Sequence, residues 1–180
     1  MIGIKREHVS RHAAFMSRYG DLSAGANMDS RTIQEIAGTI TTDRCTELAV
    51  RLVDIPSLTG NEQPIAECVH AILGEMGAHS YMQEFEPARY NTIGRLRGRN
   101  GGATLLLNGH MDIAFNGTEQ YLPKGPGYQP KAVVKDGWIY GMGVHNMKGG
   151  CAAFLAAAEA IRKSGIDVST VSRSVASSFG

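Results

Sequence analysis

The chain has 180 residues, of which 43% are hydrophobic, and its formal net charge is +1. This length and composition suffice for one domain with a core, and the near-neutral charge gives no indication of nucleic acid or an anionic membrane as a partner. No apolar run approaches the roughly 20 residues of a membrane span. Cys45, Cys68 and Cys151 form no C-x-x-C pair and fall in apolar helical patterns, which favours reduced, buried thiols in a cytoplasmic protein.

The first 27 residues show no clear periodicity, with charges and histidines scattered through them. They contain no continuous apolar stretch, so a secretory signal is not expected. Met28 would be a more natural start, and the alternative is an ordinary extension. We therefore expect residues 1–27 to be an N-terminal extension, native or not, and residues 28–180 to form one domain.

Two amphipathic helices are predicted next. The first is capped near Thr42, has apolar residues at helical spacing and is closed by Pro56. The second begins at the T-x-x-E pattern of residues 59–62, which has the form of a capping box. Its apolar stripe stops at Gly77, a residue type that commonly ends helices.

Strands and one further helix are expected in the second half of the chain. The strands are predicted near residues 80–85, 91–96, 104–108 and 138–140. Residues 117–130 are rich in Gly and Pro and indicate a long surface loop. A helix is predicted over residues 147–163, stopped by Gly165. Residues 169–180 are rich in Ser with little pattern, and we expect them to be disordered.

The first motif that can carry chemistry is Gly109-His110-Met111-Asp112, directly after an apolar run. Side chains alternate along a strand, so His110 and Asp112 project the same way. An imidazole is a good ligand for zinc or cobalt, and a nearby carboxylate can orient the ring and raise its basicity. The alternative is a surface pair that follows a strand.

The second motif is the glycine-rich run Gly141-Met142-Gly143-Val144-His145-Asn146-Met147-Lys148-Gly149-Gly150, which opens the last helix. It is not a dinucleotide fingerprint, because Asn146 stands at the third glycine position. It is not a phosphate-binding P-loop either, because Gly149 follows Lys148 where Ser or Thr is needed. Two glycines would weaken the first helical turn, so a close approach of backbone or ligand is expected there.

Together these motifs resemble the G-H-x-D and G-x-G-x-x-D-M-K-G-G signatures of the M20 metallopeptidase family, which includes acetylornithine deacetylases, succinyl-diaminopimelate desuccinylases, aminoacylases and glutamate carboxypeptidases. Residues 52–62 resemble the N-terminal pattern of that family, and the resemblance covers about residues 52–165. It implies an α/β fold of the zinc-exopeptidase type, with a mixed sheet flanked by helices. It also implies hydrolysis of amide C–N bonds in small N-acyl amino acids or peptides, with zinc, cobalt or manganese as cofactor.

The resemblance assigns His110 as a metal ligand and Asp112 as the catalytic residue that supports it. Asn146 replaces the Asp that bridges two metal ions in the family. Its amide is neutral and offers one good oxygen ligand, so it is expected to be a poor ligand; as an alternative it would cap the following helix. His145 is expected to be a partly exposed loop residue.

The general-base Glu, the remaining ligands and the smaller lid domain, which commonly carries the homodimer contact, belong to family segments that would follow position 180. The resemblance therefore predicts the N-terminal part of a catalytic domain, inactive by itself. One alternative is a non-catalytic globular remnant or binding module of the same fold. Another is a misassembled gene product whose neighbour encodes the rest.

Overall fold

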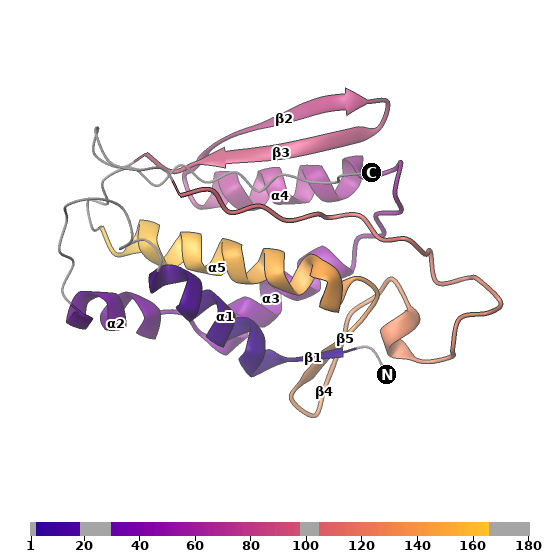
Figure 1. The fold of residues 1–180 in the computed structure, drawn as a ribbon, viewed down its shortest axis with the longest axis horizontal. Helices are drawn as coiled ribbons and strands as arrows, with labels where there is room; N and C mark the ends of the chain where they lie inside the picture. Colours follow the sequence, from indigo (N-terminus) through magenta and orange to yellow (C-terminus); the bar gives the residue numbers. More distant parts are fainter. Residues whose placement is uncertain (1–2, 19–29, 98–104, 166–180) are drawn as a thin grey trace.

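The computed structural model describes residues 3–18, 30–97 and 105–165 (Figure 1). The helices are α1 (Arg6–Arg18), α2 (Ser30–Gly38), α3 (Thr42–Val53), α4 (Gln63–Glu75) and α5 (Gly149–Lys163), with a 3₁₀ turn η2 (Pro126–Tyr128) and a π-helical turn η3 (Val144–Lys148). The strands are β1 (Gly3–Lys5), β2 (His79–Glu86), β3 (Arg89–Arg95), β4 (Val133–Lys135) and β5 (Trp138–Tyr140). Within these ranges no helix combines the length and hydrophobicity needed to cross a bilayer.

The strands form two small sheets. One has three antiparallel strands in the order β1-β5-β4, and the other is the β2-β3 hairpin. An isolated parallel bridge joins Leu58 to Ile113. The expected α/β class is confirmed, and so are the strands near 80–85, 91–96 and 138–140. In the described residues the parallel component of the expected mixed sheet is limited to that bridge.

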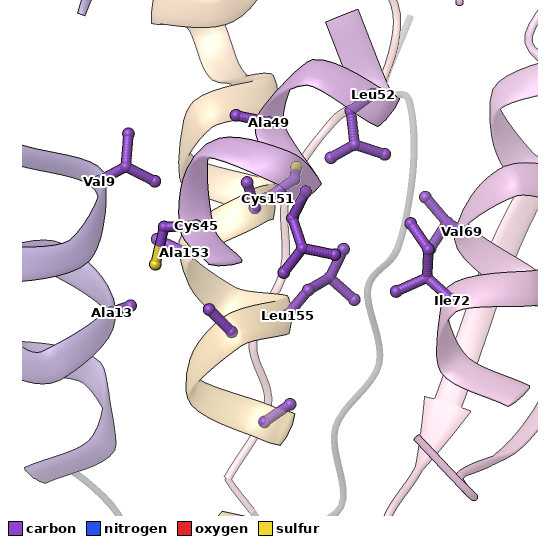
Figure 2. Packing of buried hydrophobic residues seen from close by; sticks show 14 of the residues in the cluster. Val9, Ala13, Cys45, Ala49, Leu52, Val69, Ile72, Cys151, Ala153 and Leu155 are labelled. Atoms are coloured by element: carbon purple, nitrogen blue, oxygen red, sulfur yellow. The ribbon is translucent and has the colours of Figure 1, made fainter. Parts of the chain in front are cut away.

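The core is built around α5, which is apolar and buried along almost its whole length. Its small side chains let α1 and α3 approach α5 closely. Figure 2 shows Val9 of α1 and Cys45 of α3 in the cluster that they form with α5. Val69 and Ile72 of α4 close the cluster from the far side. Burial of this kind is the main stabilising term, worth about 1.5–3 kcal/mol for each fully buried large aliphatic side chain.

The N-terminal segment is part of this core. Val9 and Ala13 are 1% and 0% exposed, and β1 extends the sheet at β5. The Arg6 guanidinium donates to Thr46 Oγ1 at 2.9 Å and pairs with Asp43. The sequence shows no clear pattern here because α1 contributes only two buried apolar residues among those described, four positions apart, to the contact. The boundary at residue 28 stays a prediction, and residues 19–29 lie outside the described residues.

The predicted helix starts need correction. The hydroxyl of Thr41, not Thr42, caps α3 by accepting from the Arg44 amide at 3.1 Å. The predicted capping box is wrong, because α4 begins after Glu62 without a side-chain cap and the Thr59 hydroxyl binds elsewhere. The end of α4 is confirmed at Gly77, where φ is +71°.

Residues 105–112 run in an extended conformation alongside α5 (Figure 1). Leu107, Gly109 and Met111 are buried, whereas Leu106 is 60% exposed, as expected of a strand with one buried face. However, the backbone groups of residues 105–109 take part in none of the backbone hydrogen bonds between described residues. Residues 105–108 of the strand predicted at 104–108 are therefore extended but have no ladder partner in the described part of the chain.

We expect this extended segment to be the least protected part of the described core. Unpaired strand edges template association, and contiguous exposed apolar patches larger than about a few hundred Å² are unusual in soluble monomers. Amide hydrogen exchange should therefore be fast at residues 105–109 and slow in α5, and the chain should bind a hydrophobic dye or be poorly soluble. Protected amides at 105–109 in a monomeric sample would contradict this. The predicted disorder of residues 169–180 lies outside the described residues.

Candidate functional site

The site is built on the end of the extended segment. The His110 Nδ1–H donates to Asp112 Oδ1 at 3.1 Å, and the Thr59 hydroxyl donates to Asp112 Oδ2 at 2.7 Å. The side chains of His110 and Asp112 are 31% and 16% exposed. The carboxylate is thus held by two donors and fixes the orientation of the imidazole, which leaves Nε2 facing outward.

Asn146 lies opposite that nitrogen. Its Oδ1 is 2.9 Å from His110 Nε2, although the two residues are 36 positions apart in the chain. In this orientation of the amide, His110 Nε2 donates to Asn146 Oδ1, whereas with the amide reversed the Asn146 NH₂ group would donate to Nε2. The structure thus brings together the three site residues that the sequence singled out, His110, Asp112 and Asn146.

The expected helix-capping role of Asn146 is wrong. Its backbone has φ −136° and ψ 95°, and α5 begins three residues later with Lys148 at the cap position and no side-chain cap bond. The side chain of Asn146 turns toward His110 instead. His145 is exposed, as expected, and lies on the wall of the cavity beside the site.

The loop of residues 111–113 is held by the chain that follows α3. The Ser57 hydroxyl donates to the Met111 carbonyl at 2.7 Å, and the Ser57 carbonyl accepts from the Ile113 amide at 2.8 Å. The Thr59 amide donates to the Ile113 carbonyl at 3.1 Å. Residues 55–59 therefore form a bracket for the His–Asp pair, and we call them the bracket segment.

Close packing fixes the other side of His110. A Cβ atom at Gly109 would lie 2.9 Å from Met147 Cε and 3.0 Å from Cys151 Sγ, so a larger residue would have to displace these two side chains. The Cys151 thiol lies 3.5 Å from the His110 carbonyl as a donor. Burial raises the pKa of Cys151 to about 12, which keeps the thiol protonated for this contact.

The turn that carries Asn146 depends on close backbone approaches. Gly143 has φ +78°, and a Cβ there would lie 2.6 Å from Ile113 Cγ2. A Cβ at Gly149 would lie 2.6 Å from the Val144 carbonyl oxygen. The close approach expected from the sequence is therefore confirmed, and the turn is seated directly on the loop of the His–Asp pair.

Lys148 ends this turn and is almost fully buried, with 1% exposure. Its Nζ donates to the Ile55 carbonyl at 2.7 Å. Burial lowers the pKa of Lys148 to about 8, because removing an ammonium group from water disfavours its charged form. Neither this contact nor that of Thr59 could be predicted from the sequence, since both join residues far apart in the chain.

A cavity of about 740 Å³ opens beside His110 and Asn146. Its wall combines the polar groups of the site with apolar side chains, lined by Gly3, His110, Asp112, Ile113, Ala114, Phe115, Leu122, Gly127, Tyr128, Met142, Gly143, His145 and Asn146. Such a mixture suits a small molecule with an apolar part and a polar group to be oriented. The Gly- and Pro-rich loop predicted at residues 117–130 contributes to this wall.

The residues present do not by themselves fit a catalytic metal. The atoms left to coordinate a metal ion are His110 Nε2 and the Asn146 amide oxygen. Both oxygens of Asp112 are already engaged, by His110 and by Thr59. Among the described residues, no three His, Cys, Asp or Glu side chains form a group that could hold a metal ion. A catalytic zinc commonly has about three protein ligands, so this donor set is incomplete.

Comparisons with known proteins agree with this architecture. Residues 106–172 match the model of peptidase family M20/M25/M40. The chain is 29% identical over 110 residues to N-formyl-4-amino-5-aminomethyl-2-methylpyrimidine deformylase of Bacillus subtilis (strain 168), across 60% of this chain and 25% of that protein. It is 32% identical over 111 residues to succinyl-diaminopimelate desuccinylase of Wolbachia pipientis subsp. Culex pipiens (strain wPip), across 62% of this chain and 27% of that protein.

Among solved structures, the fold is similar to a tripeptidase from Staphylococcus aureus subsp. aureus Mu50. The TM-score is 0.57 at 23% identity, over 77% of this chain and 37% of the tripeptidase. This likeness shows the fold, which is an α/β unit that carries the His–Asp pair and the glycine-rich turn. The chain is similar to proteins of the M20 family over the stretches given above, and it spans about a quarter of the length of the curated relatives it matches.

Proposed function

We propose that this chain is the N-terminal part of an M20-type catalytic domain, from a hydrolase of amide C–N bonds in small N-acyl amino acids or peptides. The observation that carries the proposal is the hydrogen-bonded series from Asp112 through His110 to Asn146 on the wall of a cavity of about 740 Å³. The family as a whole acts on amide bonds, and the deformylase and desuccinylase are named for such reactions.

Each residue has a role in this proposal. His110 offers Nε2 as a metal ligand, and Asp112 is the supporting carboxylate that orients it. Asn146 contributes a weak neutral oxygen where the family has a bridging carboxylate. Zinc, cobalt or manganese would require further ligands from outside the described residues, because this donor set is incomplete.

Location and assembly are also proposals. We propose a cytoplasmic protein, because Cys45, Cys68 and Cys151 are free thiols and two of them are buried. The partner is a small amide substrate, with neither nucleic acid nor membrane expected from a net charge of +1. A homodimer, common among complete M20 proteins, is proposed only for a chain that also carries the lid domain.

A second candidate function is a non-catalytic binding module of the same fold. The observation that favours it is the uncharged side chain of Asn146, whose Oδ1 engages His110 Nε2 in a hydrogen bond at 2.9 Å. With the imidazole engaged in this way, the cavity would bind a small polar ligand without cleaving it. Metal affinity separates this candidate from the hydrolase.

We expect Asn146→Asp to raise the affinity of the chain for Zn²⁺ or Co²⁺ by on the order of tenfold or more, equivalent to ~1.4 kcal/mol. The substitution places a carboxylate next to His110 Nε2, and charged oxygen ligands bind cations more tightly than neutral ones. Isothermal titration calorimetry measures the effect. Asn61→Asp, which adds the same charge at an exposed position, should leave the affinity unchanged.

The result must also depend on the imidazole. His110→Ala in the Asn146→Asp background should return the metal affinity to the wild-type level, since it removes the imidazole nitrogen that binds the metal together with the new carboxylate. Equal gains for Asn146→Asp and Asn61→Asp would show that the effect is general electrostatic attraction. In that case position 146 is not part of a metal site, and the binding module becomes the better candidate.

A further inference from the structure

The proposed function leaves one buried charge unexplained. Lys148 is 1% exposed, and none of the ion pairs between described residues includes it. An ammonium group without a carboxylate partner is costly to bury, and a cation at the start of a helix opposes the helix dipole. A hydrophobic residue of similar length would avoid both costs. We therefore look for an interaction of the Lys148 amine that a hydrophobic side chain could not make.

The amine makes one directed contact. It donates to the Ile55 carbonyl at 2.7 Å, across 93 residues of sequence. No other hydrogen bond to this carbonyl occurs between described residues. The aliphatic stem of Lys148 packs under the turn, because a Cβ at Gly143 would lie 3.3 Å from Lys148 Cδ. The side chain therefore both fills the space beneath the turn and reaches the first residue of the bracket segment.

This contact joins the two halves of the site. The bracket segment holds the His–Asp loop through Ser57 and Thr59. Lys148 belongs to the turn that carries Asn146, two positions after that residue. The Lys148 amide also donates to the Gly143 carbonyl at 2.9 Å, which closes that turn. Lys148 is thus bonded to the turn through its backbone and to the bracket segment through its side chain.

We propose that Lys148 is a positioning residue that fixes the Asn146 turn against the bracket segment and so sets the separation of His110 Nε2 from the Asn146 side chain. The proposal rests on the proposed function for the meaning of the site, whereas the geometry it describes belongs to the chain itself. Lys148 touches no reacting group and acts through the two segments that it joins.

The test is NMR spectroscopy of the 180-residue chain carrying Lys148→Met, which keeps the length of the side chain and removes the donor. We expect the methyl signals of Leu52 and Leu155 in the core to stay in place. The His110 imidazole and the Asn146 side-chain amide should lose their hydrogen-bonded ¹⁵N shifts. The amides of residues 144–148 should exchange at least about tenfold faster, since the turn opens more often.

Two further variants isolate the contact. Lys135→Met removes an exposed lysine on β4 and should change none of these signals. Lys148→Arg retains a donor and a positive charge, and should restore the His110 and Asn146 signals at least in part. Unchanged His110 and Asn146 signals in Lys148→Met would overturn the proposal. So would a uniform shift of all core signals that Lys148→Arg does not rescue, because that pattern indicates a purely structural role.

A measurement on the unmodified chain covers the case in which Lys148→Met does not fold. Native-state hydrogen exchange in low denaturant should give residues 55–59 and 143–149 the same opening free energy, since Lys148 joins them. Separate openings would refute the coupling. Neither readout involves metal or hydrolysis, so a chain without metal affinity would count against the proposed function and leave the role of Lys148 intact.

Discussion

The 180-residue chain is expected to release no product above the buffer rate from N-acyl amino acids or short peptides, with Zn²⁺, Co²⁺ or Mn²⁺ added. Among the described residues that line the cavity, the only carboxylate is that of Asp112, and its two oxygens are engaged by His110 and Thr59. A positioned general base is typically worth about 10²–10⁴-fold in rate. The incomplete donor set removes a metal-activated water as well.

Mass-spectrometric detection of the released amine gives this assay the necessary sensitivity. The Wolbachia desuccinylase on its own substrate serves as a positive control. Asn146→Asp is expected to tighten metal binding without producing turnover, because it adds a ligand and no base. Turnover by the chain that disappears in His110→Ala would show that a working site forms from these 180 residues.

Local sequence patterns were enough for the elements that local interactions determine. The helical spacing before Pro56 predicted α3, and Gly77 marked the end of α4 correctly. The strands β2, β3 and β5 lie where strands were predicted, near residues 80–85, 91–96 and 138–140. These features depend on side-chain periodicity and on backbone conformations within a few residues, which a sequence displays directly.

Two of the errors involve a polar side chain that has a distant partner. Thr59 was assigned to a capping box, but its hydroxyl binds Asp112, 53 residues away. Asn146 was assigned to the start of a helix, but its amide faces His110. The sequence shows that such residues favour caps, and it does not show that tertiary structure offers them a better partner.

The site was found from the sequence in part. His110 and Asp112 follow from strand alternation, which places both on one face, and the structure does join them through Nδ1 and Oδ1. Their metal and catalytic roles stay predictions. The sequence does not predict the hydrogen bond from Lys148 to the Ile55 carbonyl. A lysine at the start of a helix indicates neither burial nor a carbonyl partner 93 residues away.

The second large effect is expected on stability, when the N-terminal segment is removed. Removing residues 1–27 should lower the free energy of unfolding by ~3 kcal/mol or more, since it exposes the faces of α3 and α5 that α1 covers. Val9 and Ala13 are 1% and 0% exposed within this contact, and Figure 2 shows both directed at the core. If residues 1–27 are a dispensable extension, urea denaturation of the shortened chain will give the original midpoint.

A point substitution tests the same contact without shortening the chain. Val9→Asp buries a carboxylate against α5 and should cost several kcal/mol, on the order of the penalty for an unpaired buried charge that shifts toward its neutral form. His8→Asp is the matched control, because it adds the same charge at the neighbouring exposed position of the same helix. Surface changes of this kind usually lie within about 0.5 kcal/mol. A large loss for Val9→Asp alone would establish α1 as part of the folded domain, whereas equal effects of the two variants would mean that the helix does not pack on α5 in solution.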